Sequence, residues 1–308
     1  MFDIVGIGGS FHDILMLMER FPKENTKNNR LEDVFHQGGG PVATGLCAAS
    51  RLGSSCSLMT PLGDDDGAEF MKKEYAKDNI DISSSPIRPG TTTHTSYIIV
   101  NRDTGNRTIC GKGGTVGRLT EADINFDLIK SAKVLMLDGS SGTEVGVAAA
   151  KFAREHGVKV MLDSEWPSQG MLEITEHTDF LITSEDCMYE YGESKDIEEC
   201  LRNAFAKGKH DIVVATLGNK GGAAFDGKDF FLYPIYPAEV VDTNGCGDVF
   251  HGAFAFGYTQ GWSYNKICHF ASGVSSMKCM KLGGRSGIPT LSQLKEWLTP
   301  YYDLDAHE

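Results

Sequence analysis

The sequence predicts an α/β protein built on a doubly wound, mostly parallel sheet with helices on both faces. Short apolar runs that are typical of buried strands recur along the chain, at residues 2–7, 133–137, 158–162, 180–183 and 212–217. Segments with the 3.6-residue period of an amphipathic helix lie between and after them, at residues 144–156, 197–207 and 249–258. Strands that alternate with helices favour a parallel sheet, in which ligands bind beyond the carboxyl ends of the strands.

Two stretches, residues 14–37 and 91–114, break this rhythm because they lack a clear helical period. In the second stretch, the β-prone runs 95–100 and 107–109 flank residues 103–106, Asp-Thr-Gly-Asn, which is typical of a hairpin turn. We therefore expect both stretches to form a small β lid that is inserted in the main domain.

The length and composition predict a single domain that spans residues 1–308, and they limit the partners that it can bind. The chain carries 29 lysines and arginines against 42 aspartates and glutamates, a net charge of −13, so we expect neither nucleic acid nor anionic membranes as partners. The eight cysteines contain no C-x-x-C pair, which favours reduced thiols in the cytoplasm. The first residues have no basic segment and no long apolar run, so we expect no signal peptide and no membrane helix.

Residues 241–257 carry the strongest chemical signal of the chain. Gly245, Cys246 and Gly247 run directly into Asp248, and an apolar, helix-like segment follows. Glycines let successive N–H groups point to one side, and the start of a helix adds free N–H groups and a partial positive charge. This arrangement binds an anion, typically phosphate, and Asp248 would place a carboxylate at its rim. A phosphate cradle beside a base is what a kinase needs to pass phosphate to a hydroxyl.

Two motifs make the chain similar to the ribokinase-like (PfkB) family of carbohydrate kinases. Residues 242–248, Asp-Thr-Asn-Gly-Cys-Gly-Asp, resemble the family's C-terminal signature D-T-x-G-A-G-D, with Cys246 in place of alanine. Residues 38–53, which begin Gly-Gly-Gly-Pro and end Arg-Leu-Gly, resemble the other signature. The resemblance covers essentially the whole chain. It implies a ribokinase-like fold whose lid covers a small sugar, and transfer of the γ-phosphate of ATP to a sugar hydroxyl with Mg²⁺.

The resemblance also implies how the sugar is held. Asp13 follows the first strand, where the family has a sugar-binding aspartate, and a carboxylate can accept hydrogen bonds from two neighbouring hydroxyls. Gly39 and Gly40 would let the backbone approach the sugar, and Asp248 would orient and deprotonate the reacting hydroxyl. Thr44 stands where most relatives have asparagine, so we expect a substrate whose hydroxyl pattern differs from that of ribose.

The detail of the motifs is most similar to the branch that includes sulfofructose kinase. Lys27, Lys278-Cys279 and the stretch 283–289 carry this likeness, and Lys27 would bind the substrate. The acceptor stays open between ribose, fructose, a modified ketose such as sulfofructose, and a nucleoside.

For the nucleotide, the resemblance implies loops that follow the later strands. The expected ATP-binding residues are Ser184, Thr216, Gly218, Gly221, Lys278 and Gly283. The family usually has N-x-x-E near the metal, whereas residues 184–187 here read Ser-Glu-Asp-Cys, so the motif does not say how Mg²⁺ is held. Many relatives bind K⁺ beside the anion hole, and Asp242 and Asn244 stand at the matching positions.

Three other readings of the sequence stay open. A nucleoside kinase of the same family would share every motif. A sugar or nucleotide sensor without catalysis could use the same fold, and the absence of N-x-x-E is compatible with that alternative. A nicotinamide enzyme is a poorer match, because the glycines at residues 6–9 lack the third glycine of the dinucleotide fingerprint. Two lids could also pair to form a homodimer.

Overall fold

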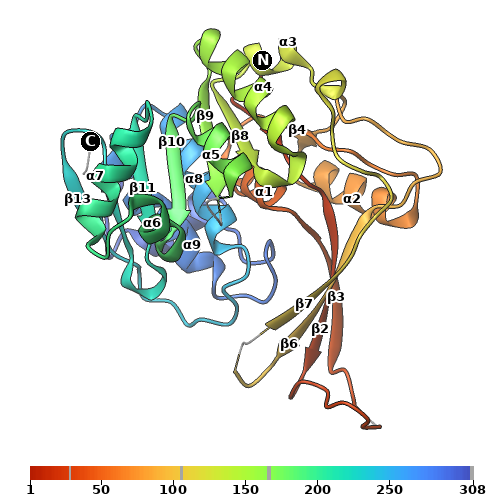
Figure 1. The fold of residues 1–308 in the computed structure, drawn as a ribbon. Coiled ribbons are helices and arrows are strands. Elements are labelled where there is room, and N and C mark those ends of the chain that lie inside the picture. Colours follow the sequence, from red (N-terminus) through yellow and green to blue (C-terminus); the bar gives the residue numbers. More distant parts are fainter. Residues whose placement is uncertain (28, 105–106, 165–167, 306–308) are drawn as a thin grey trace.

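A nine-stranded sheet forms the centre of the fold (Figure 1). The structure, a computed structural model, describes residues 1–27, 29–104, 107–164 and 168–305. In space the strands follow the order β13-β12-β11-β10-β9-β8-β1-β4-β5. Their bounds are Ile4–Ile7 (β1), Cys56–Met59 (β4), Ile80–Asp81 (β5), Val134–Asp138 (β8), Lys159–Ser164 (β9), Phe180–Ser184 (β10), Ile212–Thr216 (β11), Gly222–Phe225 (β12) and Phe230–Tyr233 (β13).

The strand directions confirm the mostly parallel sheet. Every pair from β11 through β5 is parallel, and only β12 and β13 at one edge run antiparallel. The five apolar runs named from the sequence correspond to β1, β8, β9, β10 and β11. The sheet also contains the short strands β4, β5, β12 and β13, of two to four residues each, which those five runs did not include.

Helices cover both faces of this sheet, which confirms the doubly wound arrangement. One face packs against α1, α2, α8, α9 and α10, and the other against α3 to α7. Alternate strand residues serve the two sides: Ile4 lies in the first core, whereas Val5 and Ile7 lie in the second. The helices are Pro41–Leu52 (α1), Asp66–Lys77 (α2), Phe126–Lys130 (α3), Thr143–Glu155 (α4), Gln169–Thr175 (α5), Glu185–Gly192 (α6), Ile197–Lys207 (α7), Cys246–Thr259 (α8), Tyr264–Lys278 (α9) and Leu291–Leu298 (α10).

A second, four-stranded sheet projects from the body (Figure 1). Its order is β3-β2-β6-β7, with β2 and β6 parallel and both outer pairs antiparallel. The strands are Phe11–Met18 (β2), Asp33–Gly39 (β3), His94–Asn101 (β6) and Arg107–Lys112 (β7). Of the expected hairpin turn between β6 and β7, residues 105–106 lie outside the described residues. That this sheet acts as a lid stays a prediction.

None of the helices in the described part of the chain combines the length and the apolar character that crossing a bilayer requires.

Candidate active site

The turn before α8 presents a backbone N–H group to open space. Gly245 is the N-cap of α8, and its φ of 76° is a left-handed conformation that glycine adopts without strain. The N–H of Gly247 meets no hydrogen-bond acceptor among the described residues, and a Cβ placed there would meet no atom within 4 Å. Cys246 differs from expectation, because its N–H already donates to the Thr243 carbonyl at 3.3 Å. Of the three N–H groups predicted to bind an anion, that of Gly247 is therefore the best placed to do so.

Two cavities meet at the same turn. One has a volume of about 480 Å³ and the other about 470 Å³. Their walls share Thr216, Thr243, Cys246 and Gly247. An anion bound to the N–H of Gly247 would therefore lie where the two cavities join.

The cavity of about 470 Å³ lies between the second sheet and the body. It brings together five residues that the sequence assigned to the acceptor and its activation: Asp13, Gly39, Gly40, Thr44 and Asp248. Strands of the second sheet supply one wall, which includes Phe11, Gln37, His94, Ser96, Ile98, Arg107 and Ile109. We call this space the acceptor cavity.

Asp13 is buried in the wall of the acceptor cavity and packs against a glycine. Burial raises the pKa of its carboxyl group to about 6, although the Ser96 hydroxyl and the charge of Arg285 act in the opposite direction. A Cβ on Gly39 would collide with this carboxylate, so the glycine leaves room for the Asp13 side chain in its observed position. Gly40, with φ of 100°, packs in the same way against the Gly9 carbonyl. The glycine run thus makes room for protein atoms.

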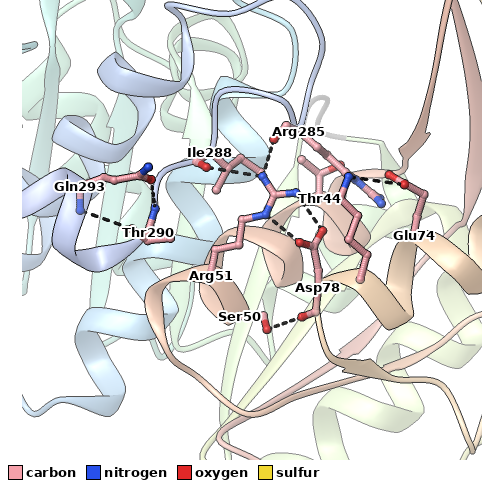
Figure 2. A network of polar contacts seen from close by, with 10 residues as sticks. Thr44, Ser50, Arg51, Glu74, Asp78, Arg285, Ile288, Thr290 and Gln293 are labelled. Carbon is pink, nitrogen blue, oxygen red and sulfur yellow. Dashed lines mark hydrogen bonds and ion pairs between the residues drawn. The ribbon is translucent and has the colours of Figure 1, made fainter.

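Arg285 is a buried cation behind the acceptor cavity, and the sequence singled it out only as part of the stretch 283–289. Its Nε–H donates to Thr44 Oγ1 at 3.2 Å, and its Nη2–H donates to the Gly39 carbonyl at 3.0 Å. Its own carbonyl accepts a hydrogen bond of 2.7 Å from Arg51 Nη1, and Arg51 pairs with Asp78 (Figure 2). A buried charge needs such partners. The network therefore fixes Thr44 from behind the cavity.

The crossing of α1 and α8 brings Thr44 and Asp248 into one cavity. At this crossing a Cβ on Gly252 would collide with the carbonyl of Gly45. A Cβ on Gly45 would lie 3.0 Å from the carbonyl of Asp248. Glycine on both helices therefore lets the two backbones touch, and the residues beside the crossing face the same space. Spacing along the sequence could not have revealed this contact.

Asp163 and His251 form a second polar pair in the acceptor cavity, and the sequence did not point to Asp163. His251 Nδ1 lies 3.3 Å from Asp163 Oδ2 and 2.8 Å from the carbonyl of Gly247. Burial lowers the pKa of His251, so we treat the imidazole as neutral near pH 7 and its approach to Asp163 as a polar contact, not an ion pair. Nowhere in the described residues, this cavity included, do three His, Cys, Asp or Glu side chains group closely enough to hold a metal ion by themselves.

The cavity of about 480 Å³ has a largely apolar wall, and we call it the nucleotide cavity. Three of the residues expected to bind ATP, Thr216, Gly218 and Gly221, line it. Its apolar wall includes Tyr233, Ile235, Tyr236, Pro237, Val240 and Phe250. An aromatic and aliphatic wall beside a phosphate-binding turn suits a flat base that is joined to phosphates.

Ser184, Lys27, Lys278 and Gly283 lie elsewhere than expected. Ser184 lines the acceptor cavity, not the nucleotide cavity. Lys27 is exposed in the segment between β2 and β3 and lines neither cavity.

Lys278 and Gly283 also line neither cavity, because both support the turn from behind. Lys278 Nζ donates to the carbonyls of Asp242 and Asn244, and the Gly283 N–H donates to Asp242 Oδ2 at 2.8 Å. Glu185, the residue nearest to the missing N-x-x-E, pairs with Lys220 at 2.9 Å.

Comparison with known proteins agrees with this geometry. Residues 2–291 match the model of the pfkB family carbohydrate kinases. The ribokinase of Lactococcus lactis is 27% identical, over 90% of this chain and 93% of that protein. Mouse ketohexokinase is 25% identical, over 92% of this chain and 98% of its own. The structure of Arabidopsis thaliana ribokinase complexed with ribose and ATP superposes with a TM-score of 0.83 at 22% identity, covering 96% and 98% of the two chains. The chain therefore belongs to the PfkB family of carbohydrate kinases, which confirms the predicted ribokinase-like fold and the predicted ATP-dependent sugar kinase.

Proposed function

We propose that the chain binds ATP in the nucleotide cavity and a small sugar in the acceptor cavity, and transfers the γ-phosphate across the turn at residues 245–248. The observation that carries this proposal is that the two cavities join at Gly247, while Asp248 faces the acceptor side. Substrates in the two cavities would have their reacting groups on opposite sides of one anion-binding N–H.

In this proposal Asp248 accepts the proton of the reacting hydroxyl and orients that hydroxyl toward the phosphate. Phosphoryl transfer depends mainly on position and on stabilisation of charge, so a fixed carboxylate and a fixed N–H donor serve it well. Asp13 accepts hydrogen bonds from other hydroxyls of the sugar, and Thr44 adds one hydroxyl to the same cavity. The likeness to the sulfofructose kinase branch stays a prediction.

Mg²⁺ fits the carboxylates of the acceptor cavity. Mg²⁺ prefers oxygen ligands, keeps several waters and is bound by one or two carboxylates together with substrate phosphates. Asp163 and Asp248 are the two carboxylates near the shared wall that would hold it. When bound, the ion neutralises charge on the transferring phosphate. K⁺ at Asp242 and Asn244 does not fit in the same way, because the Lys278 ammonium lies on both carbonyls.

A homodimer through the lids is a further part of the proposal. Several large apolar side chains are exposed on the second sheet or in the segment next to it: Leu31, Val34, Phe35, Tyr97 and Ile109. The strand register places Val34 and Tyr97 together on the face of the sheet opposite to Asp13, where apolar side chains would contact a second copy. Light scattering tests this, and a monomer at micromolar concentration would contradict it. The cytoplasmic location stays a prediction.

An ATP-consumption screen with Mg²⁺ tests the central proposal. We expect turnover with at least one of the pentoses, hexoses, ketoses and sulfonated ketoses, and little turnover with nucleosides. Preference for a nucleoside would favour the nucleoside kinase alternative, and no ATP turnover with any acceptor would contradict the proposal.

A further inference from the structure

Lys278 is a buried cation whose partners are backbone carbonyls. It is the last residue of α9, and its side chain has no exposed surface. Its Nζ donates to the Asp242 carbonyl at 3.1 Å and to the Asn244 carbonyl. An ammonium group has three hydrogens to donate, and burying it is costly unless it is hydrogen-bonded or paired. The carbonyls of this turn thus stabilise a positive charge inside the protein.

Those two carbonyls belong to the turn that leads into the anion-binding N–H groups. The carboxylate of Asp242 organises the same turn, since it accepts hydrogen bonds of 2.8 Å from the N–H groups of Asn244 and Gly283. The Cys279 carbonyl accepts hydrogen bonds from the N–H groups of Val241 and Asp242. The end of α9 therefore anchors the turn from one side, and Gly245 and α8 follow from it.

Carbonyl groups that converge on one point are also the ligands that K⁺ takes in place of water. The resemblance placed K⁺ at Asp242 and Asn244, but in this chain the ammonium group of Lys278 already donates to both carbonyls. A K⁺ ion and the ammonium group could not occupy this position together, because both would need the same carbonyl oxygens.

We propose that the Lys278 ammonium serves as a built-in monovalent cation for this turn, so that the protein needs no K⁺. The inference rests on the proposed function only in that the turn holds the phosphate-binding N–H of Gly247. Lys278 is a positioning residue, since it lines neither cavity and acts through the turn. Its positive charge satisfies the carbonyls of Asp242 and Asn244 whatever the salt of the surrounding solution.

The test compares wild-type protein with Lys278→Ala at equal ionic strength in potassium, ammonium, sodium or choline chloride. For the wild type we expect little difference between potassium and choline chloride. The kcat/KM for ATP should differ by less than about twofold, and the melting temperature by less than about 1 °C. For Lys278→Ala we expect kcat/KM for ATP to be lower than that of the wild type in choline chloride. K⁺ or NH₄⁺ should raise it by at least about tenfold, because either ion restores a positive charge on the two carbonyls. K⁺ should also raise the variant's melting temperature.

Lys266→Met is the matched control. Lys266 lies near the start of the same helix, with its Nζ 4.9 Å from the centre of the Trp262 ring. Its replacement removes a largely buried lysine without touching the turn, so it should not create a response to K⁺.

A wild-type protein that K⁺ but not choline activates or stabilises would overturn the inference, and so would a folded Lys278→Ala that responds to neither K⁺ nor NH₄⁺. If Lys278→Ala does not fold in any salt, the wild-type comparison decides alone. Melting temperatures separate failure of this inference from failure of the proposed function. They show whether the cation stabilises the protein even if no sugar is phosphorylated.

Discussion

The body and the second sheet hold their parts of the site in different ways. In the body, α1 and α8 touch backbone to backbone at Gly45 and Gly252. In the second sheet, all six residues of β7 are exposed, and the buried apolar cluster has three members, Leu15, Ile98 and Val100. Elements with few buried apolar contacts open at low cost in free energy, whereas a backbone crossing within a large core does not.

This difference assigns different tasks to the two regions. We propose that the body fixes the anion-binding turn and Asp248 before any substrate arrives, and that the second sheet, which carries Asp13, closes over the sugar. We therefore expect substitutions in the body to lower kcat or the use of ATP, and substitutions in the second sheet to raise the KM for the sugar. Four predictions test this division, in order of decreasing effect.

The largest effect is expected for Asp248→Asn in the body. Asparagine keeps the shape of the side chain but cannot accept the proton, and such roles are commonly worth about 10²–10⁴-fold in rate. Steady-state kinetics should show kcat lower by this factor, while the melting temperature and ATP binding by calorimetry stay close to wild type. A variant with nearly wild-type kcat would mean that Asp248 serves only as an acidic residue in the first turn of α8.

Gly247→Ala and Gly252→Ala make a matched pair on α8. The new methyl group at position 247 would stand in open space where the cavities join, so we expect kcat/KM for ATP to fall by about 10²-fold with stability unchanged or slightly higher. At position 252 it would collide with the carbonyl of Gly45, so we expect a loss of about 1–3 kcal/mol in the free energy of unfolding.

Urea denaturation and ATP kinetics on both glycine variants measure the contrast. Loss of stability at position 247 without loss of ATP use would remove the anion-binding role. A stable Gly252→Ala would mean that the two helices are not in backbone contact.

In the second sheet, the raised pKa of Asp13 predicts a pH dependence of sugar binding. Below about pH 6 the carboxyl group takes up a proton and loses an acceptor, so the Kd for the sugar should rise by up to about tenfold per pH unit. Calorimetry from pH 5 to 8 measures this without turnover, and ATP binding supplies the control. Asp13→Asn should bind the sugar weakly and without this pH dependence, and an unchanged pH profile in that variant would contradict the assignment.

The raised pKa of Asp13 also makes the stability of the protein depend on pH. Because the pKa of Asp13 is higher in the folded protein than in the unfolded chain, its contribution to stability is present at low pH and is lost as pH rises through about 6. Asp13→Asn should therefore raise the melting temperature at pH 7.5 and change it less at pH 4.

Sequence patterns predicted those parts of the fold that depend on local order. The runs that became β8 to β11 are buried and apolar, and the turn before α8 is continuous in sequence, so residues 245–248 could be found directly. Contacts between distant segments could not be found in this way. Arg285 reaches Thr44 across 241 positions, and Lys278 reaches Asp242 across 36. Lysine and arginine are usually exposed, so nothing in the sequence indicated that Arg285 is buried, and the family likeness singled out Lys278 only as an ATP-binding residue.

The smallest effect is expected at Thr44, which we propose contacts the sugar from the body. Arg285 donates to Thr44 Oγ1, so the threonine hydroxyl keeps its own hydrogen for a group in the cavity, such as a sugar oxygen. In Thr44→Asn the side-chain oxygen can accept from Arg285 while the NH₂ group offers two donors, so the preference among sugars should shift by up to about tenfold, the value of one hydrogen bond. Thr44→Val would instead leave the Arg285 Nε–H unpaired and should cost about 1–3 kcal/mol in stability.

Competition between pairs of sugars measures the preference, and Thr44→Ser is the control that keeps the hydroxyl. An unchanged order of preference in a stable Thr44→Asn would place Thr44 outside the reach of the sugar. A change in kcat without any change in the preference among sugars would instead mean that α1 acts only through its crossing with α8. The division of tasks between the body and the second sheet would then hold for Asp13 but not for Thr44.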